Sequence, residues 1–461
     1  MTDVTARDDD TEIGALDGGW AQRRLSDSTG RTVATQLVCR PDRPSRLQSA
    51  IPAPEGRSLI ARGGGQSLGD GALNDGGAVA LTVRLDRMLS FDAQSRILIA
   101  EAGVTIGDIL RTFLPRAHMP AVCPTPATAT LGGIIAADSY GSNHVRAGSF
   151  GQHVVWLDLI TPRDGLRRVS PDQDADVFDA TIGGMGLTGL IVRAAIRLVP
   201  AASAFVTVHR RAVRSLDALI DELATAARAH DYAAAWIDAL ADGAAQGRGV
   251  LETADIAAAG KRKWTPMPLD AAAGLSATIK NALPLRALNA QRFRRAMKGR
   301  SAMLALDRFL FQQDRIASSR EPEDRHRFAR FHCVLPRDGA TAAVRRLFDI
   351  ARRGGGASCV AAHAVADEGR GHLSVARPGI GLTLDLPAPV AVANLMHRLE
   401  RETLDRGGRV FLASDSHLTD HGFAAMYPRL AAFRTVLAAV DPDMRLQSDL
   451  ARRLRFRDYI V

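Results

Sequence analysis

The order of apolar and polar residues along this chain predicts short strands and helices side by side. Residues 97–100 form a short apolar run, which predicts a buried strand. Apolar residues then recur at helical spacing over 106–114, behind Thr105 as an N-cap with Asp108 three residues on, and Pro115 ends the pattern. This succession predicts an α+β fold rather than regular strand–helix–strand units.

The chain also divides into regions that differ in composition and in predicted secondary structure. Residues 19–200 are rich in glycine, with a strand over Val154–Thr161, a hairpin turn at 162–165 and another strand over 190–198. Residues 201–408 are rich in alanine and arginine, with a helix over 215–230 and a strand over 381–386. Residues 409–461 return to strand and helix. The polar residues 1–18 are expected to be disordered.

Composition limits the classes of protein that remain. With 461 residues, the chain is long enough for two or three domains. It has no apolar run long enough to span a membrane and no secretory signal at its start, so a cytoplasmic location is expected. Its four cysteines lack the spacing of a metal site or a disulfide framework. The net charge of +9 suggests an anionic partner, and a solvated basic surface is the alternative.

Three glycine clusters carry the strongest chemical signal. The first, 61–70, contains Gly63, Gly64 and Gly65 directly after a short apolar strand, so backbone amides can form an anion-binding nest. The second, 128–138, is dominated by small residues that let a flat ring lie against the backbone. The third, 183–189, satisfies GxGxxG. It follows a predicted helix and precedes a strand, the reverse of the order in a Rossmann site.

With these clusters in this order, the chain resembles the flavoenzymes of the vanillyl-alcohol oxidase and p-cresol methylhydroxylase superfamily. Within it, the resemblance is greatest to the decaprenylphosphoryl-β-D-ribose 2′-oxidase family, most of all in 62–74, 132–157, 180–196, 235–238 and 426–454. The resemblance implies a bipartite FAD-binding domain of the p-cresol methylhydroxylase type, formed by 19–200 and 409–461. An α+β substrate domain, 201–408, would be inserted between the two parts.

The resemblance also implies the residues that bind FAD. They are Arg62, Gly63, Gly64, Gly65, Gln66, Ser67, Leu68 and Gly69 at the pyrophosphate, then Thr130, Gly132, Gly133, Ala136, Tyr140, Gly141 and Asn143, and finally Met185, Gly186 and Ile191. Many superfamily members have a histidine bonded to the flavin where this chain has Gln66, so non-covalent FAD is expected. Cys123, near the second cluster, is the alternative for a covalent link.

Four positions at the catalytic end depart from the ribose oxidases. Tyr140 replaces a histidine, His332 a glutamine, Thr383 a cysteine and Ser414 a lysine. His332 alternates with apolar neighbours on a predicted strand, so it can face the flavin pocket as a proton acceptor, and its structural alternative is a core histidine. Arg330, on the same face, is a candidate for the missing positive charge. Tyr140 is expected to stack on the flavin or to transfer a proton.

The candidate catalytic residues are therefore His332, Tyr140 and Arg330, and the candidate substrate residues are Trp236, His332, Thr383 and Ser414; no metal site is expected. The expected activity is oxidation of a hydroxyl group on a sugar or polyol derivative by hydride transfer to FAD. A polyprenyl-phosphate-linked pentose is one candidate substrate. The alternatives are an aldonolactone or alditol oxidase, and a flavoprotein without turnover that binds a partner.

The remaining expectations concern partners. Oxygen or a quinone would accept the electrons, and no nucleic acid is expected to bind. Residues 286–300 contain six basic residues and no acidic residue, which fits either a solvated helix or a peripheral contact with an anionic membrane.

Overall fold

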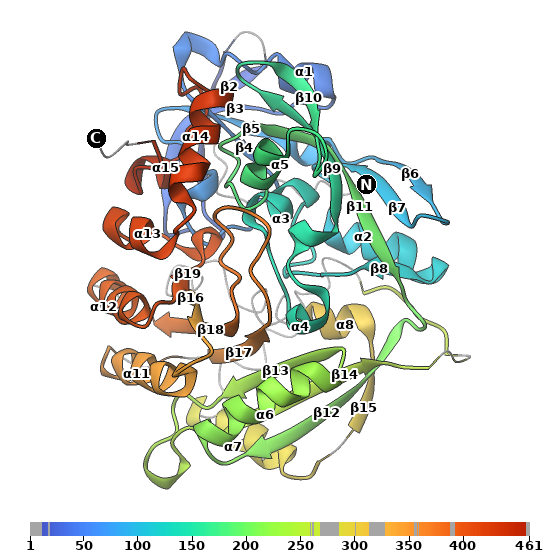
Figure 1. Ribbon diagram of the computed structural model, residues 1–461, viewed down its shortest axis with the longest axis vertical. Helices are drawn as coiled ribbons and strands as arrows, with labels where there is room; N and C mark the ends of the chain where they lie inside the picture. The colour runs from blue at the N-terminus through green and yellow to red at the C-terminus, as the bar shows by residue number, and fades with distance from the viewer. Residues whose placement is uncertain are drawn as a thin grey trace.

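The computed structural model describes residues 12–16, 19–258, 260, 262–267, 285–299, 301–312, 328–354, 357, 359–387 and 392–457. These residues build three sheets with helices around them, which confirms the α+β prediction (Figure 1). The two smaller sheets lie in the upper part of the view, and the large sheet lies below them.

The first sheet is mixed and carries the first glycine cluster at its edge. Its order is β1 (Glu12–Leu16), β2 (Trp20–Ser26), β3 (Val33–Cys39), β5 (Ala78–Leu81) and β4 (Leu59–Arg62), and the last two strands are parallel. The helix α1 (Pro44–Gln48) follows β3. The prediction that residues 1–18 are disordered is wrong for 12–16, because β1 pairs antiparallel with β2.

The second sheet is antiparallel. Its order is β10 (Gly165–Val169), β9 (Val154–Thr161), β11 (Leu190–Pro200), β7 (Ile97–Glu101) and β6 (Met88–Asp92), and β8 (His118–Pro120) also pairs with β11. The associated helices are α2 (Ile106–Phe113), α3 (Leu131–Ala137), α4 (His144–Ala147) and α5 (Ala175–Thr181). The predicted cap of α2 is confirmed, because the Thr105 hydroxyl accepts from the Asp108 amide at 3.1 Å.

The third sheet is antiparallel and has eight strands. Its order is β15 (Ser301–Ala305), β12 (Phe205–Val213), β14 (Gly249–Ile256), β13 (Tyr232–Ile237), β17 (Cys359–Val365), β18 (Gly379–Pro387), β16 (Phe328–Pro336) and β19 (Arg409–Val410). The helices of this region are α6 (Leu216–Ala229), α7 (Leu285–Ala296), α8 (Leu306–Leu310), α11 (Ala340–Arg353) and α12 (Val392–Asp405). The apolar faces of α6, α11 and α12 share one core cluster with this sheet.

The end of the chain returns to the first sheet through α13 (Asp420–Met426), α14 (Leu430–Val440) and α15 (Asp449–Arg453). Leu446 forms a parallel bridge with Leu59 of β4, which ties this tail to the strand that enters the glycine cluster. The predicted boundary at 409 differs in detail, because Arg409 and Val410 still pair with β16. In the described part of the chain, no single helix is long and apolar enough to cross a bilayer; α13 and α14 reach that length only together, across a bend of 106°.

Candidate active site

The first glycine cluster forms a loop between β4 and the second cluster. A Cβ at Gly63 would lie 2.0 Å from the Thr130 hydroxyl oxygen, and one at Gly64 would lie 2.6 Å from the Thr128 carbonyl oxygen. Gly65 has φ of +62°, and a Cβ there would lie 2.5 Å from the Arg62 guanidinium. A side chain at Gly63 or Gly64 would therefore clash with the second cluster. At Gly65 the left-handed backbone conformation also disfavours any residue with a side chain.

The second and third clusters meet behind this loop. The amides of Met185 and Gly183 donate to the carbonyl oxygens of Ala136 and Ile135 at 2.9 and 3.0 Å. Met185 and Gly186 both have positive φ, so this turn needs a glycine or a tolerated left-handed residue at each position. The contact fixes the third cluster against α3.

The three clusters enclose a cavity of about 380 Å³, within the roughly 300–1,000 Å³ usual for ligand pockets. Most residues predicted to bind the cofactor line it: Gly63, Gly64, Gly65, Gln66, Ser67, Leu68, Thr130, Gly132, Gly133, Ala136, Tyr140, Gly141, Asn143, Met185, Gly186 and Ile191. His332, Arg330, Thr383 and Ser414 line it as well. Segments that are far apart in the sequence therefore line the same cavity.

Two predicted cofactor residues lie outside this lining, and the prediction is wrong on their placement. The Arg62 guanidinium sits behind the loop and donates to the carbonyl oxygens of Ser26 at 2.7 Å and Ala72 at 3.4 Å. Gly69 packs against the backbone of Asp415, whose carbonyl oxygen would lie 1.7 Å from a Cβ. Both residues therefore shape the loop from outside the cavity.

Trp236 was predicted to pack on the substrate pocket, and the structure contradicts this. It shares a sheet face with Tyr232 and Ala234, which line the cavity, but it lies further along β13. There it packs in a separate apolar cluster with Val250 and Phe293. Because α7 covers this part of the sheet, Trp236 is buried away from the cavity.

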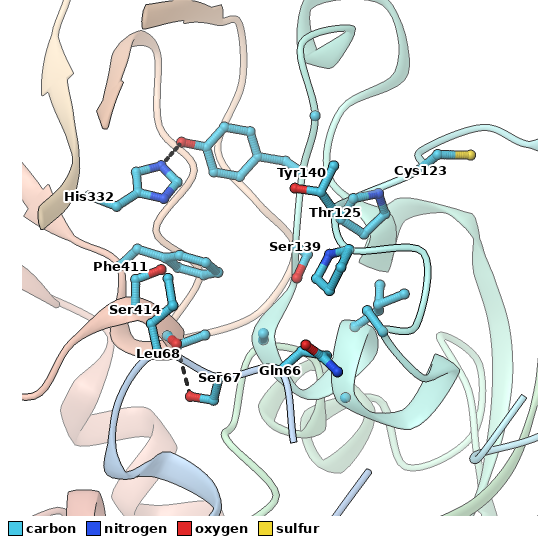
Figure 2. Close-up of a pocket in the computed structure, with 18 of the residues that line it drawn as sticks. Gln66, Ser67, Leu68, Cys123, Thr125, Ser139, Tyr140, His332, Phe411 and Ser414 are labelled. Carbon is cyan, nitrogen blue, oxygen red and sulfur yellow. Dashed lines mark hydrogen bonds between the residues drawn. The ribbon is translucent and has the colours of Figure 1, made fainter. Parts of the chain in front are cut away.

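At the far end of the cavity, Tyr140 and His332 form a hydrogen-bonded pair. The Tyr140 hydroxyl oxygen lies 2.8 Å from Nε2 of His332, above Phe411 (Figure 2). Burial raises the pKa of Tyr140 well above its ordinary value. Burial, His363 and the Arg330 cation lower the pKa of His332 to about 3. Both side chains are therefore uncharged near neutral pH.

Arg330 was predicted to provide a positive charge for the reaction. It lines the cavity, and its guanidinium makes a two-pronged ion pair with Asp385 of β18 at 2.7 and 3.1 Å. The neighbouring carboxylate balances its charge, so the pair presents little net charge to the cavity.

The comparisons with known proteins agree with this geometry. A family model described as an FAD binding domain matches residues 35–170. The decaprenylphosphoryl-β-D-ribose oxidase of Mycolicibacterium smegmatis is 30% identical over 450 residues, which cover 95% of this chain and 96% of that protein. An uncharacterised protein of Streptomyces coelicolor is 34% identical over 385 residues, 76% of this chain and 100% of that one.

The chain belongs to the family of decaprenylphosphoryl-β-D-ribose oxidase. It is an FAD-dependent oxidoreductase that acts on CH–OH donors. Over a shorter stretch, L-galactono-1,4-lactone dehydrogenase 2 of Oryza sativa is 26% identical across 174 residues, 37% of this chain and 30% of that protein.

The cavity of this flavoenzyme fits FAD in its chemistry. The Thr130 hydroxyl is buried at the cavity wall without a hydrogen-bond partner in the described structure, as expected for a group that awaits a ligand. The walls beside it are formed by Ala129, Gly132, Gly133 and Ala136, which leave backbone exposed to a flat ring. The residues of the three clusters would therefore hold the dinucleotide.

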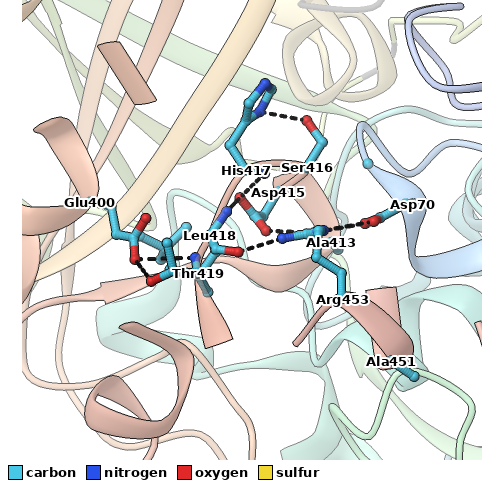
Figure 3. Close-up of polar contacts among 12 residues, drawn as sticks. Asp70, Glu400, Ala413, Asp415, Ser416, His417, Leu418, Thr419, Ala451 and Arg453 are labelled. Carbon is cyan, nitrogen blue, oxygen red and sulfur yellow. Dashed lines mark hydrogen bonds and ion pairs between the residues drawn. The ribbon is translucent and has the colours of Figure 1, made fainter. Parts of the chain in front are cut away.

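In this flavoenzyme the turn that carries Ser414 is bonded to the glycine loop. The Ser67 hydroxyl and the Leu68 amide both donate to the Ala413 carbonyl oxygen, at 2.9 and 3.1 Å (Figure 2). Arg453 of α15 binds Asp70 at 2.9 Å and Asp415 at 3.0 Å, so it bridges the loop and the turn (Figure 3). The hydrogen bonds to Ala413 and the ion pairs of Arg453 together place Ser414 at the cavity.

The same turn is held from its other side. Glu400 of α12 accepts hydrogen bonds from the backbone and side chain of Thr419, and Asp415 accepts from the Leu418 amide at 2.9 Å (Figure 3). The backbone of the turn that carries Ser414 is therefore held by contacts from two sides.

His363 and Phe411 also line the cavity of this enzyme, and neither was predicted from the sequence. The ring centroid of His363 lies 5.1 Å from that of Tyr140, and Phe411 lies 5.1 Å from His332. His363 is the one polar side chain among small and apolar residues on β17, which is a signal that could have drawn attention to it.

Proposed function

We propose that this enzyme oxidises a secondary hydroxyl group of a sugar or polyol derivative. The observation that carries the proposal is the hydrogen-bonded, uncharged Tyr140–His332 pair in the wall of the cavity that the three glycine clusters enclose. When bound, FAD supplies the hydride acceptor at N5 of its ring. The protein must then bind the donor hydroxyl and take its proton.

Tyr140 and His332 are suited to that task. The Tyr140 hydroxyl can donate its proton to His332 Nε2 while its oxygen accepts a hydrogen bond from the donor hydroxyl. As the carbon loses hydride, the donor proton is held at Tyr140 Oη and the tyrosine proton moves to His332 Nε2. Positioned proton transfer of this kind contributes roughly 10²- to 10⁴-fold to a rate.

The eight-stranded sheet is the proposed substrate domain. It contributes His332, Thr383 and Ala361 to the cavity, and these residues pair side by side across β16, β18 and β17. The Thr383 and Ser414 hydroxyls are uncharged groups that can hydrogen-bond to the remaining hydroxyls of a donor. The small serine side chain at 414 leaves more room than a lysine would.

The relatives' names suggest two classes of donor. The name of one relative gives a lipid-linked pentose as its substrate, and the name of another gives an aldonolactone. We therefore keep a polyprenyl-phosphate-linked pentose and a free aldonolactone or alditol as the two candidate substrates. Oxygen or a quinone is the proposed electron acceptor.

An anaerobic donor screen tests the proposal. Polyols, aldonolactones and prenyl-phosphate sugars are added to the holoenzyme, and loss of the oxidised flavin absorbance is followed. We expect one class to reduce the flavin, and peroxide formation on readmission of air would indicate oxygen as acceptor. If no hydroxyl donor reduces the flavin, the proposal fails and a flavoprotein without turnover becomes the better description.

Variants then assign the roles. Tyr140→Phe and His332→Gln should each slow reduction roughly 10²-fold or more and retain FAD. The matched control is Tyr427→Phe, which removes another buried phenol whose hydroxyl donates to the Val410 carbonyl oxygen outside the cavity lining. Reduction at the wild-type rate in Tyr140→Phe would remove that residue from the reaction.

A further inference from the structure

A second histidine lies beside the proposed proton-transfer pair. His363 is on β17, and its ring centroid lies 5.1 Å from that of Tyr140 and 6.2 Å from that of His332. Its Nε2 atom is buried and has no hydrogen-bond partner in the described structure. A buried polar atom left unpaired destabilises a folded protein, so this atom needs an explanation.

Gly381 of β18 lies opposite His363 in the sheet. A Cβ on this glycine would lie 2.7 Å from His363 Nε2 and 2.8 Å from the Tyr140 hydroxyl oxygen. The unpaired ring nitrogen and the proposed proton carrier therefore approach the same backbone point, and the missing side chain keeps the space beside them clear.

Metal binding does not explain the cluster, because no group of three His, Cys, Asp or Glu side chains among the described residues could hold an ion. The titratable groups facing His363 are Tyr140 and His332 of the pair and His144 of α4. Burial and His144 lower the pKa of His363 to about 4, so its ring is neutral near pH 7. A neutral imidazole can donate or accept a hydrogen bond to an uncharged hydroxyl.

We propose that His363 determines specificity by binding a second hydroxyl of the donor, adjacent to the one held at Tyr140, so that the site selects vicinal diols. The inference rests on the proposed function and narrows its substrate class. Each polar atom then has one partner: the reacting hydroxyl at Tyr140 Oη and its neighbour at His363 Nε2. An alcohol without the neighbouring hydroxyl leaves the histidine unpaired.

Binding is tested independently of turnover. The holoenzyme is labelled with ¹⁵N-histidine and titrated with methyl β-D-ribofuranoside and with its 3-deoxy analogue, which keeps one ring hydroxyl and lacks the neighbouring one. The Nε2 resonance of His363, assigned by its loss in His363→Leu, should shift with the diol and not with the analogue. No shift with the diol, or equal shifts with both, overturns the inference.

Kinetics supply the second arm. His363→Leu should raise KM for a diol donor about tenfold with a smaller change in kcat, and His363→Gln should restore most of the loss. Gly381→Ala keeps every functional group but places a methyl between the two polar atoms, so it should lose the same preference. His372→Leu is the control, because His372 also has a buried unpaired ring nitrogen but lies outside the cavity lining.

Failure of the proposed function can be distinguished from failure of the role proposed for His363. If no hydroxyl donor reduces the wild-type flavin, the proposed function fails while the titration still tests His363. If diols reduce the wild type and Gly381→Ala and His363→Leu keep the wild-type preference for diols over deoxy analogues, the function stands and the role of His363 is refuted.

Discussion

The guanidinium of Arg453 lies 3.0 Å from the carboxylate of Asp415, so the last described helix holds the turn that carries Ser414. The same guanidinium binds Asp70 through two hydrogen bonds of 2.9 Å. Both carboxylates are largely buried, at 8% and 7% side-chain exposure. Three charged groups from separate parts of the sequence therefore form one buried network.

Removing this arginine should destabilise the enzyme strongly. Arg453→Gln leaves two neighbouring buried carboxylates without their cation, which typically costs about 3–5 kcal/mol. Arg455→Gln is the matched control, because Arg455 directly follows the same helix, is 65% exposed and pairs with Asp420. Its loss should cost about 1 kcal/mol or less. Urea unfolding of both holoenzymes measures the difference, and equal stabilities would contradict the network's importance.

Gly65→Ala should weaken FAD retention. Alanine there combines a left-handed backbone with a Cβ 2.5 Å from the Arg62 guanidinium, which must move and disturb the loop. We expect affinity to fall roughly tenfold or more. Gly76→Ala is the control, since Gly76 has φ of +69° with nothing within 4 Å of its Cβ position. Flavin retained on gel filtration gives the readout; equal retention in the two variants would refute a role for the loop's packing.

FAD should leave the protein on acid precipitation, with a yellow supernatant and a colourless pellet. Gln66 has no ring nitrogen, and its amide donates to the Gly64 carbonyl oxygen at 2.8 Å. Burial raises the pKa of the Cys123 thiol to about 12, and Figure 2 shows its sulfur directed away from the centre of the cavity. A yellow pellet that becomes colourless in Cys123→Ser would show a thioether instead.

The buried histidines should make stability fall with acidification. Burial lowers the pKa of His144 and of His363 to about 4 and that of His332 to about 3, against about 6.5 in the unfolded chain. Below pH 6.5 the unfolded chain binds protons that the folded chain excludes. The stabilisation is therefore complete above that pH and is lost progressively toward pH 4.

The expected loss at about pH 5 is roughly 2 kcal/mol for each histidine, relative to about pH 7.5. His144→Gln should remove one such contribution, so its unfolding free energy should change less between the two pH values. His421→Gln, which alters an exposed histidine, should behave as the wild type does. An unchanged pH dependence in His144→Gln would contradict this prediction.

We propose that α7 makes a peripheral contact with anionic membranes. Arg294 and Arg295 are exposed on this helix, and Lys298 and Met297, which is 55% exposed, lie in the turn that follows it. Arg286 is paired with Asp242, and Arg292 lies over the ring of Trp236, so these two arginine side chains already have partners within the protein. Arg300 lies outside the described residues.

Sedimentation with phosphatidylserine vesicles at low salt tests this contact, which should weaken at high salt. Reversing the charges of Arg294, Arg295 and Lys298 to glutamate should abolish binding. The same reversal at Arg345, Arg346 and Arg352, exposed on α11, should not. Absence of binding by the wild type at any salt concentration removes the proposal.

The sequence predicted best what depends on local chemistry. Gly63 and Gly65 could be assigned to a ligand loop because the lack of a side chain is the property that the loop requires. Side-chain direction was harder to predict. Arg62 turns behind its loop because the Ser26 carbonyl lies there, and Trp236 is covered by α7. Such choices depend on partners distant in sequence.

His363 shows the same limit at the site. Its strand is short and apolar, and nothing nearby in the sequence indicates that Tyr140 and Gly381 will meet its ring. Residues 12–16 were assigned to disorder from their polar neighbours, whereas β1 is formed by pairing with β2. In each case long-range pairing, rather than intrinsic preference, decided the outcome.

The two-residue strand β19 has an evolutionary consequence. Val410 pairs with Cys333, and the Phe411 amide donates to the His332 carbonyl oxygen at 2.8 Å, immediately before the chain crosses to the glycine loop. Because these two contacts join backbone atoms, side chains on the neighbouring strands can be exchanged without breaking them. Gene duplication can therefore yield paralogues that inherit one redox apparatus and diverge in the molecules they consume.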